Sequence, residues 1–382
     1  MAKINVLVVY GGKSVEHDIS ILSALIIMKA LKESDKYQII PLYLTKDNEM
    51  ITFNDMYNVK SYEYKMENDI QVFKNKTFKT TLFKQNSIVY LKTFKKCSHR
   101  VKIDLIYPIL HGFGVEDGTF KGWCDILGVT AVTSPIAAAA LLQDKELTKL
   151  VLNSLNVDTL PYEVIRKKEE YKETFKYPVI IKPAHLGSSI GISVIHDNDP
   201  NISLKNEIKE KLKLAFIYDN KVIIEPCLTN FKEYSIAAFS YKNDIKISNV
   251  EEIRRTSDIY TFEDKYCENK KTDETSPRKV IPLDQLSFGV DMALEVTKIY
   301  NALNLMGIVR FDYLYDIDTN KTYLCEINTI PGSLAYYLFE KEYDIPTLFD
   351  LTIKDAMFNK QNKEHDLKTS IALNLLNMKT KK

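Results

Sequence analysis

The sequence lacks most of the features that mark secreted, membrane-bound or metal-stapled proteins. Its five cysteines lie singly along 382 residues and form no Cys-x-x-Cys pair, which excludes a disulfide or zinc framework. No apolar run reaches the roughly 18 residues of a membrane helix, and the first residues lack the basic and then apolar build of a signal peptide. We therefore expect a cytoplasmic protein with free thiols.

The chain also lacks an excess of either charge. Its 52 lysines and arginines against 51 aspartates and glutamates leave a net charge of +1, so no strong field favours nucleic acid or a membrane surface as a partner. A Gly-x-Gly-x-x-Gly motif is missing as well, which argues against a nicotinamide-dependent dehydrogenase. The composition that remains, 45% hydrophobic and 27% charged residues, is ordinary for a globular protein with two or three domains.

The first part of the chain, residues 1–133, is predicted to form an open α/β domain. Hydrophobic patterning indicates strands at 3–10, 37–44 and 101–110, helices at 16–31 and 119–127, and a polar, aromatic, irregular insertion at about 46–100. A glycine-rich turn follows the first strand, as in sheets that bind their ligand at the carboxyl ends of the strands.

Two α+β units are predicted to follow. Residues 134–230 contain a helical segment and a strand–loop–strand with the sequence YPVIIKPAHLGSSIGI, and residues 231–360 contain paired strands and a helix. Within the latter unit, residues 254–280 combine little apolar periodicity with much charge, which is typical of an active-site lid. Residues 361–382 are predicted to be a peripheral tail.

The strand–loop–strand of the second unit is suited to covering the phosphates of a nucleotide. Its first strand ends on Lys182, and Gly187 and Gly191 let backbone N–H groups approach a ligand closely. Ser188 and Ser189 add hydroxyl donors. Lys145, early in a helix, and Glu225, at the end of a strand, can add a second phosphate contact and an adenine-binding hinge. Taken alone, the loop also fits an ordinary Gly-Ser hairpin.

The third unit carries a candidate metal site. Arg310 and Asp312 share one face of a strand, and Glu326 and Asn328 share a face of the next strand, opposite Cys325 and Ile327. Two buried carboxylates and an amide oxygen are costly unless a cation balances them, and all-oxygen ligands suit Mg²⁺. An Arg310–Asp312 surface pair with an unrelated Glu326 explains these residues equally well.

Eight segments resemble, in order, the motifs of D-alanine–D-alanine ligases, which are enzymes of the ATP-grasp superfamily. The segments are GGKSVEHDIS, HGFGVEDG, DKELTK, VIIKPAHLGSSIG, VIIEP, IYTFEDKY, VRFDYLYD and EINTIPG. The resemblance implies three α+β domains, with ATP between the second and third and the amino acids near the first. It also implies ATP and two Mg²⁺ ions as cofactors, with Mn²⁺ as a substitute, and a homodimer formed largely through the first domain.

The resemblance further implies a reaction in peptidoglycan precursor synthesis. The carboxylate of one D-alanine attacks the γ-phosphorus of ATP to give an acyl phosphate. The amine of a second D-alanine attacks that carbonyl, and phosphate leaves from a tetrahedral intermediate. Because acyl phosphates hydrolyse easily, the lid at 254–280 is expected to exclude water.

Carried over by position, the resemblance assigns a role to each matching residue. The residues implied to hold the first amino acid are Glu16, Ser188 and Tyr266. Those implied to stabilise the tetrahedral intermediate are Arg310 and the backbone of Gly332, and those implied to lie beside the substrates are His111, Tyr260, Tyr337 and Leu338. The residues implied to contact ATP are Lys145, Lys182, Ser189, Glu225, Pro226, Cys227, Leu228, Glu233 and Lys265, although Glu225 and Glu233 lie one residue further apart than usual. The implied magnesium ligands are Asp312, Glu326 and Asn328.

The chain departs from the family pattern at three positions. Val115 replaces a glycine and Lys121 a glutamine, both near the expected chemistry but not in it. Tyr337 stands where the family has a serine that binds the carboxylate of the second substrate. Either the tyrosine hydroxyl reshapes that pocket, or Tyr336 and Tyr337 pack in the core and a neighbour binds the carboxylate.

Two alternative functions follow. The chain can be a ligase that adds D-serine or another amino acid or amine in second position, because of Tyr337. It can also be a regulator that binds nucleotide without catalysis. The presence of Asp312, Glu326, Asn328 and both lysines argues against the regulator.

Overall fold

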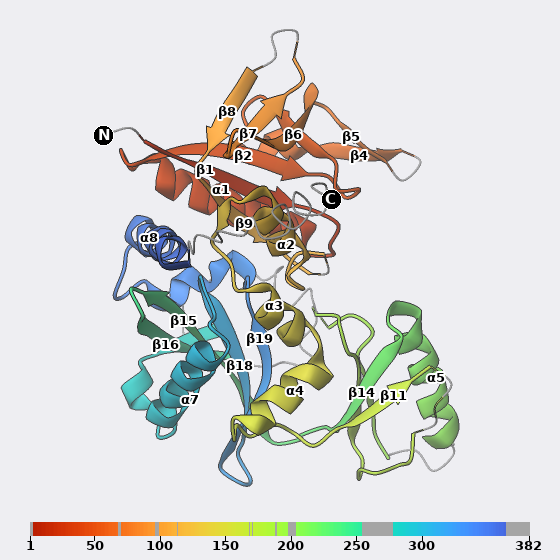
Figure 1. Cartoon of the computed structure of the whole chain (residues 1–382). Helices are drawn as coiled ribbons and strands as arrows, with labels where there is room; N and C mark the ends of the chain where they lie inside the picture. The colour runs from red at the N-terminus through yellow and green to blue at the C-terminus, as the bar shows by residue number, and fades with distance from the viewer. Residues whose placement is uncertain are drawn as a thin grey trace, which may run out of the picture.

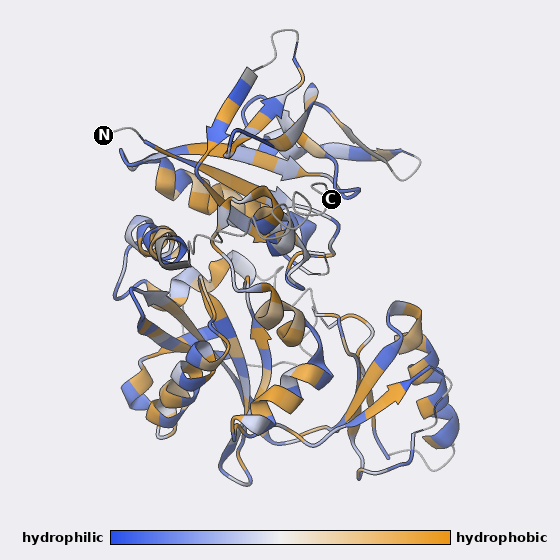
Figure 2. Cartoon of the chain, in the orientation of Figure 1, coloured by the Kyte–Doolittle hydropathy of each residue, from blue (hydrophilic) through white to orange (hydrophobic). Residues whose placement is uncertain are grey.

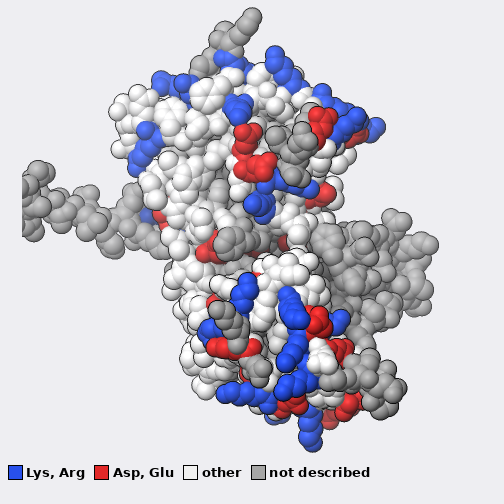
Figure 3. Space-filling view, turned by 90° about the vertical axis from the view of Figure 1, so that its right-hand side faces the viewer, with Lys and Arg blue, Asp and Glu red and all other residues white. Residues whose placement is uncertain are grey.

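The computed structural model describes residues 3–67, 70–95, 99–112, 114–167, 169, 171–187, 189–197, 204–253 and 278–363. Three main sheets follow one another along the chain. Figure 1 shows the first sheet above the other two, which lie side by side below it. Among the helices of the described residues, none combines the length and the apolar character that a membrane span needs. On the face seen in Figure 3, Lys and Arg are interspersed with Asp and Glu.

The first sheet has eight strands in the order β10-β9-β1-β2-β3-β6-β7-β8. The strands β10, β9, β1 and β2 run parallel, and the others are antiparallel to their neighbours. Covered on both sides, the central β1 has no exposed surface from Val6 to Tyr10, as is usual for parallel strands. The parallel part comprises β1 (Ile4–Gly11), α1 (His17–Lys32), β2 (Tyr37–Leu44), β9 (Leu105–Leu110), α2 (Thr119–Leu127) and β10 (Thr130–Ala131).

The insertion is more regular than the sequence predicts. It forms β3 (Met50–Phe53), the short helix η1 (Val59–Tyr62), a hairpin of β4 (Tyr64–Glu67) and β5 (Ile70–Phe73), and the strands β6 (Thr77–Gln85), β7 (Ile88–Thr93) and β8 (His99–Ile103). Leu82 and Leu91 are buried on one face, while Phe83 and Tyr90 stack on the other with ring centroids 5.7 Å apart. Because bulky residues occupy both faces, the apolar–polar alternation of a half-buried strand is masked in the sequence.

The strand predicted at 101–110 is two strands in different parts of the sheet. The chain leaves the edge strand β8 at Ile103 and enters the central β9 at Leu105. Between them, the Asp104 carboxylate accepts a hydrogen bond from the Asn5 N–H at 2.9 Å. Along the chain, a single polar residue therefore separates the edge strand β8 from the inner strand β9.

The second sheet has four antiparallel strands in the order β11-β14-β12-β13. Its elements are β11 (Glu163–Arg166), β12 (Val179–Pro183), β13 (Ser193–Ile195), α5 (Leu204–Tyr218) and β14 (Lys221–Pro226). The helix α5 places Ile208, Leu212 and Ala215 in a core that this sheet does not share with the others. In Figure 2, α5 shows hydrophilic residues with hydrophobic ones between them, whereas the strands beside it are largely hydrophobic.

Two helices precede the second sheet, α3 (Ile136–Gln143) and α4 (Lys145–Ser154). The sequence predicts one helical segment here, but Asp144 has an extended backbone and separates the two. Its carboxylate accepts hydrogen bonds from the N–H groups of Glu146 and Leu147 at 3.0 and 3.3 Å, so it caps the start of α4. Lys145 therefore begins a helix.

The third sheet has five antiparallel strands in the order β17-β16-β15-β18-β19. Its elements are β15 (Phe231–Tyr241), β16 (Asp244–Ile253), β17 (Arg278–Ile281), η2 (Leu283–Gln285), α7 (Gly289–Ala302), β18 (Val309–Asp316), β19 (Lys321–Asn328), η3 (Gly332–Phe339) and α8 (Ile345–Lys363). The predicted lid at 254–280 lies outside the described residues up to position 277. Its last residues pair in β17.

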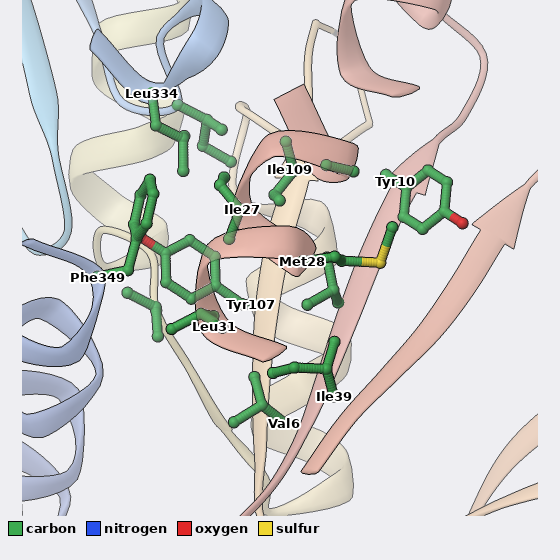
Figure 4. Close-up of a cluster of buried hydrophobic side chains, with 14 of the residues drawn as sticks. Val6, Tyr10, Ile27, Met28, Leu31, Ile39, Tyr107, Ile109, Leu334 and Phe349 are labelled. Atoms are coloured by element: carbon green, nitrogen blue, oxygen red, sulfur yellow. The ribbon is translucent and has the colours of Figure 1, made fainter. Parts of the chain in front are cut away.

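The first and third parts of the chain share one hydrophobic core. Figure 4 shows Leu334 of η3 and Phe349 of α8 close to Ile27 and Leu31 of α1, and all four belong to one buried cluster. The rings of Tyr107 and Phe349 meet edge to face with centroids 5.9 Å apart. The C-terminal helix therefore closes the underside of the N-terminal sheet.

Candidate active site

The first group of candidate residues lies beyond the carboxyl ends of the parallel neighbours β1 and β9. The segments that follow these strands carry Glu16 and His111. Gly11 has a φ of +91°, and a Cβ there would lie 2.2 Å from the carbonyl oxygen of Leu44, so this turn requires glycine. Carboxylate oxygens of Glu16 and Glu116 and a ring nitrogen of His111 lie within 4.8 Å of one another. The sheet topology thus brings three chemically active side chains together.

His111 is 3% exposed, and its ring is fixed by the third part of the chain. Its Nδ1 lies 2.8 Å from the carbonyl oxygen of Ile330. Because that oxygen can only accept, Nδ1 carries the proton. Burial lowers the pKa of His111, so the ring is neutral and Nε2 holds a lone pair. Nε2 is buried and has no hydrogen-bond partner among the described residues.

Glu116 completes this group and was not predicted from the sequence. Its carboxylate accepts a hydrogen bond from the Gly112 N–H at 2.6 Å. Desolvation, and then the nearby carboxylates of Glu16 and Glu326, raise the pKa of Glu116 to about 8. The sequence contained a clue to this residue, because Glu116 lies in the HGFGVEDG segment that follows a buried parallel strand.

Aromatic residues of the insertion support the loop that carries Glu16. The next residue, His17, places Nε2 2.6 Å from the Tyr43 hydroxyl. The Tyr43 ring packs edge to face against Tyr62 of η1, with centroids 5.7 Å apart. The hydroxyl of Tyr62 is hydrogen-bonded to that of Tyr10 on β1. The insertion therefore helps to fix the first turn of α1.

Two predicted phosphate contacts, Lys145 and Lys182, lie beside the Gly-Ser loop. Lys145 donates from Nζ to the carbonyl oxygen of Leu186 at 2.5 Å, and desolvation lowers its pKa. Lys182 donates to Glu225 at 2.6 Å. Burial alone would lower the pKa of Lys182, but the Glu225 carboxylate raises it above its ordinary value. The Lys145 ammonium therefore lies against the loop, and it is close enough to Lys182 for the charge of Lys182 to act on it.

Glu225 is held by two lysines, one of which the sequence analysis missed. Lys149 of α4 lies 2.7 Å from the second carboxylate oxygen of Glu225, and both side chains are only 4% exposed. Burial would raise the pKa of Glu225, but Lys182 and Lys149 lower it to about 2. Lys149 lies in the same DKELTK segment as Lys145, one helical turn later. This spacing places both lysines on the same face of the helix, which could have indicated a role for Lys149.

The Gly-Ser loop reaches toward the predicted metal carboxylates. A Cβ placed on Gly187 would lie 3.9 Å from Oε1 of Glu326. Glu326 also contributes to the electrostatic environment of both Lys145 and Lys182. A loop from the second sheet, two lysines and a carboxylate from the third sheet therefore meet in one region.

His185 clamps the start of the same loop and was also missed. Its Nδ1 lies 3.0 Å from Asp219, and its Nε2 lies 3.2 Å from Asp144, the cap of α4. Hydrogen bonds to Asp144 and Asp219 raise the pKa of His185 to about 9. The charged imidazole thus ties the loop to the helix that begins with Lys145.

The predicted metal ligands face one another across β18 and β19. Asp312 pairs in register with Glu326, and Arg310 pairs with Asn328. Arg310 donates to both oxygens of Asp312 at 2.8 Å, and Asn328 donates to one of them at 2.7 Å. Two carboxylates and an amide oxygen fit the preference of Mg²⁺ for oxygen ligands. Arg310 would share Asp312 with that ion.

One expectation for these strands is wrong. Cys325 and Glu326 were expected on opposite faces of their strand. The register of β18 and β19 shifts between Asp312 and Tyr313, so Cys325 pairs with no residue of β18. This bulge turns Cys325 toward Lys182 and Glu225, which are among the groups acting on its thiol; burial raises its pKa to about 12. A bulge cannot be detected from alternation alone.

Tyr337, the main departure from the family pattern, has a partner in the third sheet. Its hydroxyl donates to Glu251 at 2.9 Å, and Glu251, 3% exposed, also lies 3.5 Å from Arg278. Burial and the Glu251 charge raise the pKa of Tyr337. The next residue, Leu338, is fully buried in the core. Glu251 was another residue missed by the sequence analysis.

The remaining predicted residues fall into two groups. Gly332 begins η3, Ser189 has a φ of +59°, Cys227 donates its N–H to the Pro178 carbonyl at 2.8 Å, and Glu233 lies on β15. The roles of these residues, and those of Pro226 and Leu228, stay predictions. Ser188, Tyr260, Lys265 and Tyr266 lie outside the described residues.

Three sheets surround a region where lysines, a glycine loop and carboxylates meet, and this arrangement defines an ATP-grasp protein. Comparison with known proteins shows to which family of this superfamily the chain belongs. Residues 5–134 match the family model "D-ala D-ala ligase N-terminus", and residues 141–344 match "D-ala D-ala ligase C-terminus". The chain therefore belongs to the D-alanine–D-alanine ligase family, as its motifs indicated.

Individual relatives agree with this assignment over nearly the whole chain. The D-alanine–D-alanine ligase of Thermosipho melanesiensis is 31% identical over 99% of this chain and 100% of its own length. D-alanine–D-alanine ligase B of Clostridium tetani is 31% identical over 94% of this chain and 95% of its own. The crystal structure of the Helicobacter pylori ligase superimposes with a TM-score of 0.67 at 25% identity, covering 92% of this chain and 98% of its own. The predicted ATP-grasp fold is confirmed.

Proposed function

We propose that this chain joins two D-alanine molecules to D-alanyl-D-alanine, with conversion of ATP to ADP and phosphate through an acyl phosphate. The supporting observation is the convergence of Glu16, His111 and Glu116 with Glu326 and the two loop lysines. One part of this region suits the ammonium group of an amino acid, and the adjoining part suits a polyphosphate. The family relationship favours D-alanine in both positions over D-serine or another second substrate. It also favours a role in peptidoglycan precursor synthesis.

The first amino acid is held by its ammonium group in this proposal. Glu16 accepts from the ammonium, and the ring of His111 lies beside the Glu16 carboxylate. Glu116, held by the Gly112 N–H, limits where the cation lies. Ser188 and Tyr266 would complete this set, and Tyr260 would line the pocket from the lid. The carboxylate of the amino acid then points toward the phosphates.

The phosphates of ATP are bound by Lys145, Lys182, Ser189 and Lys265. The Glu225–Leu228 segment frames the adenine, and Glu233 reaches the ribose. Asp312, Glu326 and Asn328 would hold two Mg²⁺ ions, or Mn²⁺ in their place, which supply charge neutralisation to the transferring phosphoryl group. Glu225 has a further task, because its ion pairs hold Lys182 beside the loop.

The acyl transfer depends on groups that stabilise negative charge on oxygen. The guanidinium of Arg310 and the N–H of Gly332 would bind the oxyanion of the tetrahedral intermediate. Asp312 orients Arg310 through two hydrogen bonds of 2.8 Å. Arg310 is thereby preorganised, which lowers the cost of charge development.

The carboxylate of the second amino acid is assigned to the region of Tyr337 and Leu338. A carboxylate beside Glu251 needs positive charge, and Arg278 and Arg310 both act on the Tyr337 hydroxyl. We assign Arg278 and Tyr337 to the task that a serine performs in the family. Leu338 would contribute through its backbone, because its side chain is in the core.

The molecule is further proposed to be a cytoplasmic homodimer with domain limits of 1–133, 134–230 and 231–360, a lid at 254–280 and a peripheral tail at 361–382. No membrane or nucleic-acid partner is proposed. The near-zero net charge supports the latter point. Size-exclusion chromatography with light scattering tests the dimer.

The decisive assay incubates purified protein with ATP, Mg²⁺ and D-alanine and measures phosphate and dipeptide together. We expect equimolar phosphate and D-alanyl-D-alanine. Parallel reactions with D-alanine plus D-serine, and with L-alanine, serve as controls. Nucleotide binding without phosphate release on any pair of amino acids would support the noncatalytic regulator instead.

A further inference from the structure

Among the described residues, His111 Nε2 is a buried acceptor with no hydrogen-bond partner, and a nitrogen of the same ring lies within 4.8 Å of carboxylate oxygens of Glu16 and Glu116. The described residues contain two other buried side-chain polar atoms of this kind, the hydroxyls of Thr80 and Tyr177, and both can rotate their proton. The lone pair of His111 is fixed, because Nδ1 is bound to the Ile330 carbonyl. A buried lone pair without a partner is costly, and a cation or a donor placed between this ring and the nearby carboxylates would remove that cost.

The donor set is suited to a transition metal. One imidazole nitrogen and two carboxylate oxygens lie within 4.8 Å of one another. Zn²⁺ takes His and Asp/Glu ligands at about 2.0–2.2 Å, so adjustments of about 1 Å would close the group around the ion. Three protein ligands and an open position are typical of catalytic zinc sites.

The surroundings of the ligands match the usual second layer of such a site. A zinc-binding histidine commonly donates its other ring N–H to a backbone carbonyl, as His111 does to Ile330. The Gly112 N–H fixes the Glu116 carboxylate at 2.6 Å. The nearby Asp312, Glu326 and Asn328 offer oxygen ligands alone, so Mg²⁺ and Zn²⁺ are directed to different groups.

We propose that Glu16, His111 and Glu116 form a binding site for Zn²⁺ that competes with the ammonium group of the first amino acid. Metal binding follows from the three side chains themselves. Competition rests on the proposed function, which assigns the same region to the ammonium. Zinc would then inhibit the ligase competitively with D-alanine, while leaving the affinity for ATP unchanged.

Cobalt is the probe, because Co²⁺ takes zinc ligands and its visible spectrum reports their number and type. Metal-free protein in excess Mg²⁺ is titrated with Co²⁺, and we expect one equivalent to bind without a thiolate charge-transfer band. Zn²⁺ should then remove the signal. His111→Gln and Glu116→Gln should each weaken Co²⁺ binding at least about tenfold. His196→Gln, which removes an exposed histidine, should have no effect.

Circular dichroism checks that the variants are folded, and the near-isosteric Glu116→Gln keeps the test valid if His111→Gln is not. Stoichiometric Co²⁺ binding that survives both substitutions overturns the proposal, as does the lack of binding to the unmodified protein. D-alanine should raise the apparent Kd for Co²⁺ in proportion to its concentration. Binding that D-alanine leaves unchanged overturns the competition but keeps the metal site, and so identifies the amino-acid assignment as the part that fails.

Discussion

Two glutamates, the half-buried Glu116 and the buried Glu225, have opposite pKa shifts. Glu116 is bound by a backbone N–H and lies near two other carboxylates, and its pKa rises to about 8. Glu225 is bound by two lysines, and its pKa falls to about 2. Desolvation raises the pKa of both, so the neighbours decide the outcome.

The difference distinguishes the two ends of the site. At the proposed amino-acid end, Glu116 belongs to a group that gains stability from an added cation or proton. At the proposed phosphate end, Glu225 is ionised at neutral pH and forms ion pairs with Lys149 and Lys182. The first end is therefore built to select a positively charged group, and the second is already assembled to receive a negatively charged one.

The largest expected effect is on stability. Glu225→Gln leaves Lys149, 3% exposed, without its charge partner, and should lower the free energy of unfolding by about 3–5 kcal/mol. Glu116→Gln replaces a carboxyl whose pKa is about 8. This substitution should change the free energy of unfolding by less than about 1 kcal/mol. Urea unfolding of both variants measures this contrast, and equal losses would contradict the difference in charge state.

The second prediction concerns catalysis at the phosphate end. Lys145→Met should lower kcat by about 10²–10³-fold, because it removes the cation that we propose for stabilising the transferring phosphoryl group. Lys149→Met is the matched control on the same helix and should lower stability more than kcat. Phosphate-release kinetics and urea unfolding separate the two, and interchangeable effects would remove the distinction between Lys145 and Lys149.

The third prediction concerns pH. The pKa of His185 is raised from 6.5 to about 9 by Asp144 and Asp219, so its contribution to stability is fully present below pH 6.5. It is lost as the pH rises through 9. Because the side chain is 34% exposed, solvent screening limits this contribution to about 1 kcal/mol.

Unfolding midpoints between pH 6 and 10 test this expectation. The unmodified protein should lose more stability over this range than His185→Gln. Parallel curves for the two proteins would mean that the imidazole does not stabilise the loop through its charge.

The fourth prediction concerns the second substrate. Tyr337→Phe should raise the KM for the second D-alanine by about three- to tenfold, since the site that we propose for its carboxylate loses the Tyr337 hydroxyl and a hydrogen bond of about 1 kcal/mol. Tyr336→Phe is the neighbouring control. If Tyr337→Phe lowers stability but leaves the KM unchanged, the tyrosine packs in the core and another residue binds the carboxylate.

The smallest effect is expected in the insertion. Tyr62→Phe removes a hydroxyl that donates to the Met56 carbonyl at 2.6 Å, and should cost about 1 kcal/mol of stability with little change in kcat. Tyr64→Phe, on the adjacent hairpin, should cost less. A large loss of kcat in Tyr62→Phe would instead give the insertion a direct part in positioning Glu16.

Local patterns were enough to predict elements that are bounded by clear signals. The helix α2 was placed at 119–127 from its apolar spacing, and left-handed glycines at 118 and 128 flank it. The strands β6 and β7 were missed because bulky residues lie on both faces, leucines on one and an aromatic pair on the other. The bulge at Cys325 was missed because it depends on the pairing of two strands.

The site was predictable where a residue lies in a recognisable segment, and not where its role depends on a distant partner. Lys182 ends a strand before a glycine loop, which is a local signal. Lys149 gains its importance from Glu225, 76 residues later in the numbering. Glu251 gains it from Tyr337 in the same way. Only the folded chain brings such partners together.

The shared core of α1, η3 and α8 has a consequence for motion. Because one hydrophobic cluster joins the first and third sheets, those two parts should move as a single rigid body, with the Ile330 carbonyl holding His111 across the junction. The second sheet keeps a separate core, so it is the part that can swing as a hinged flap. Opening for ATP would then leave Glu16, His111 and Glu116 in place relative to the third sheet, while the Gly-Ser loop moves away with the second sheet.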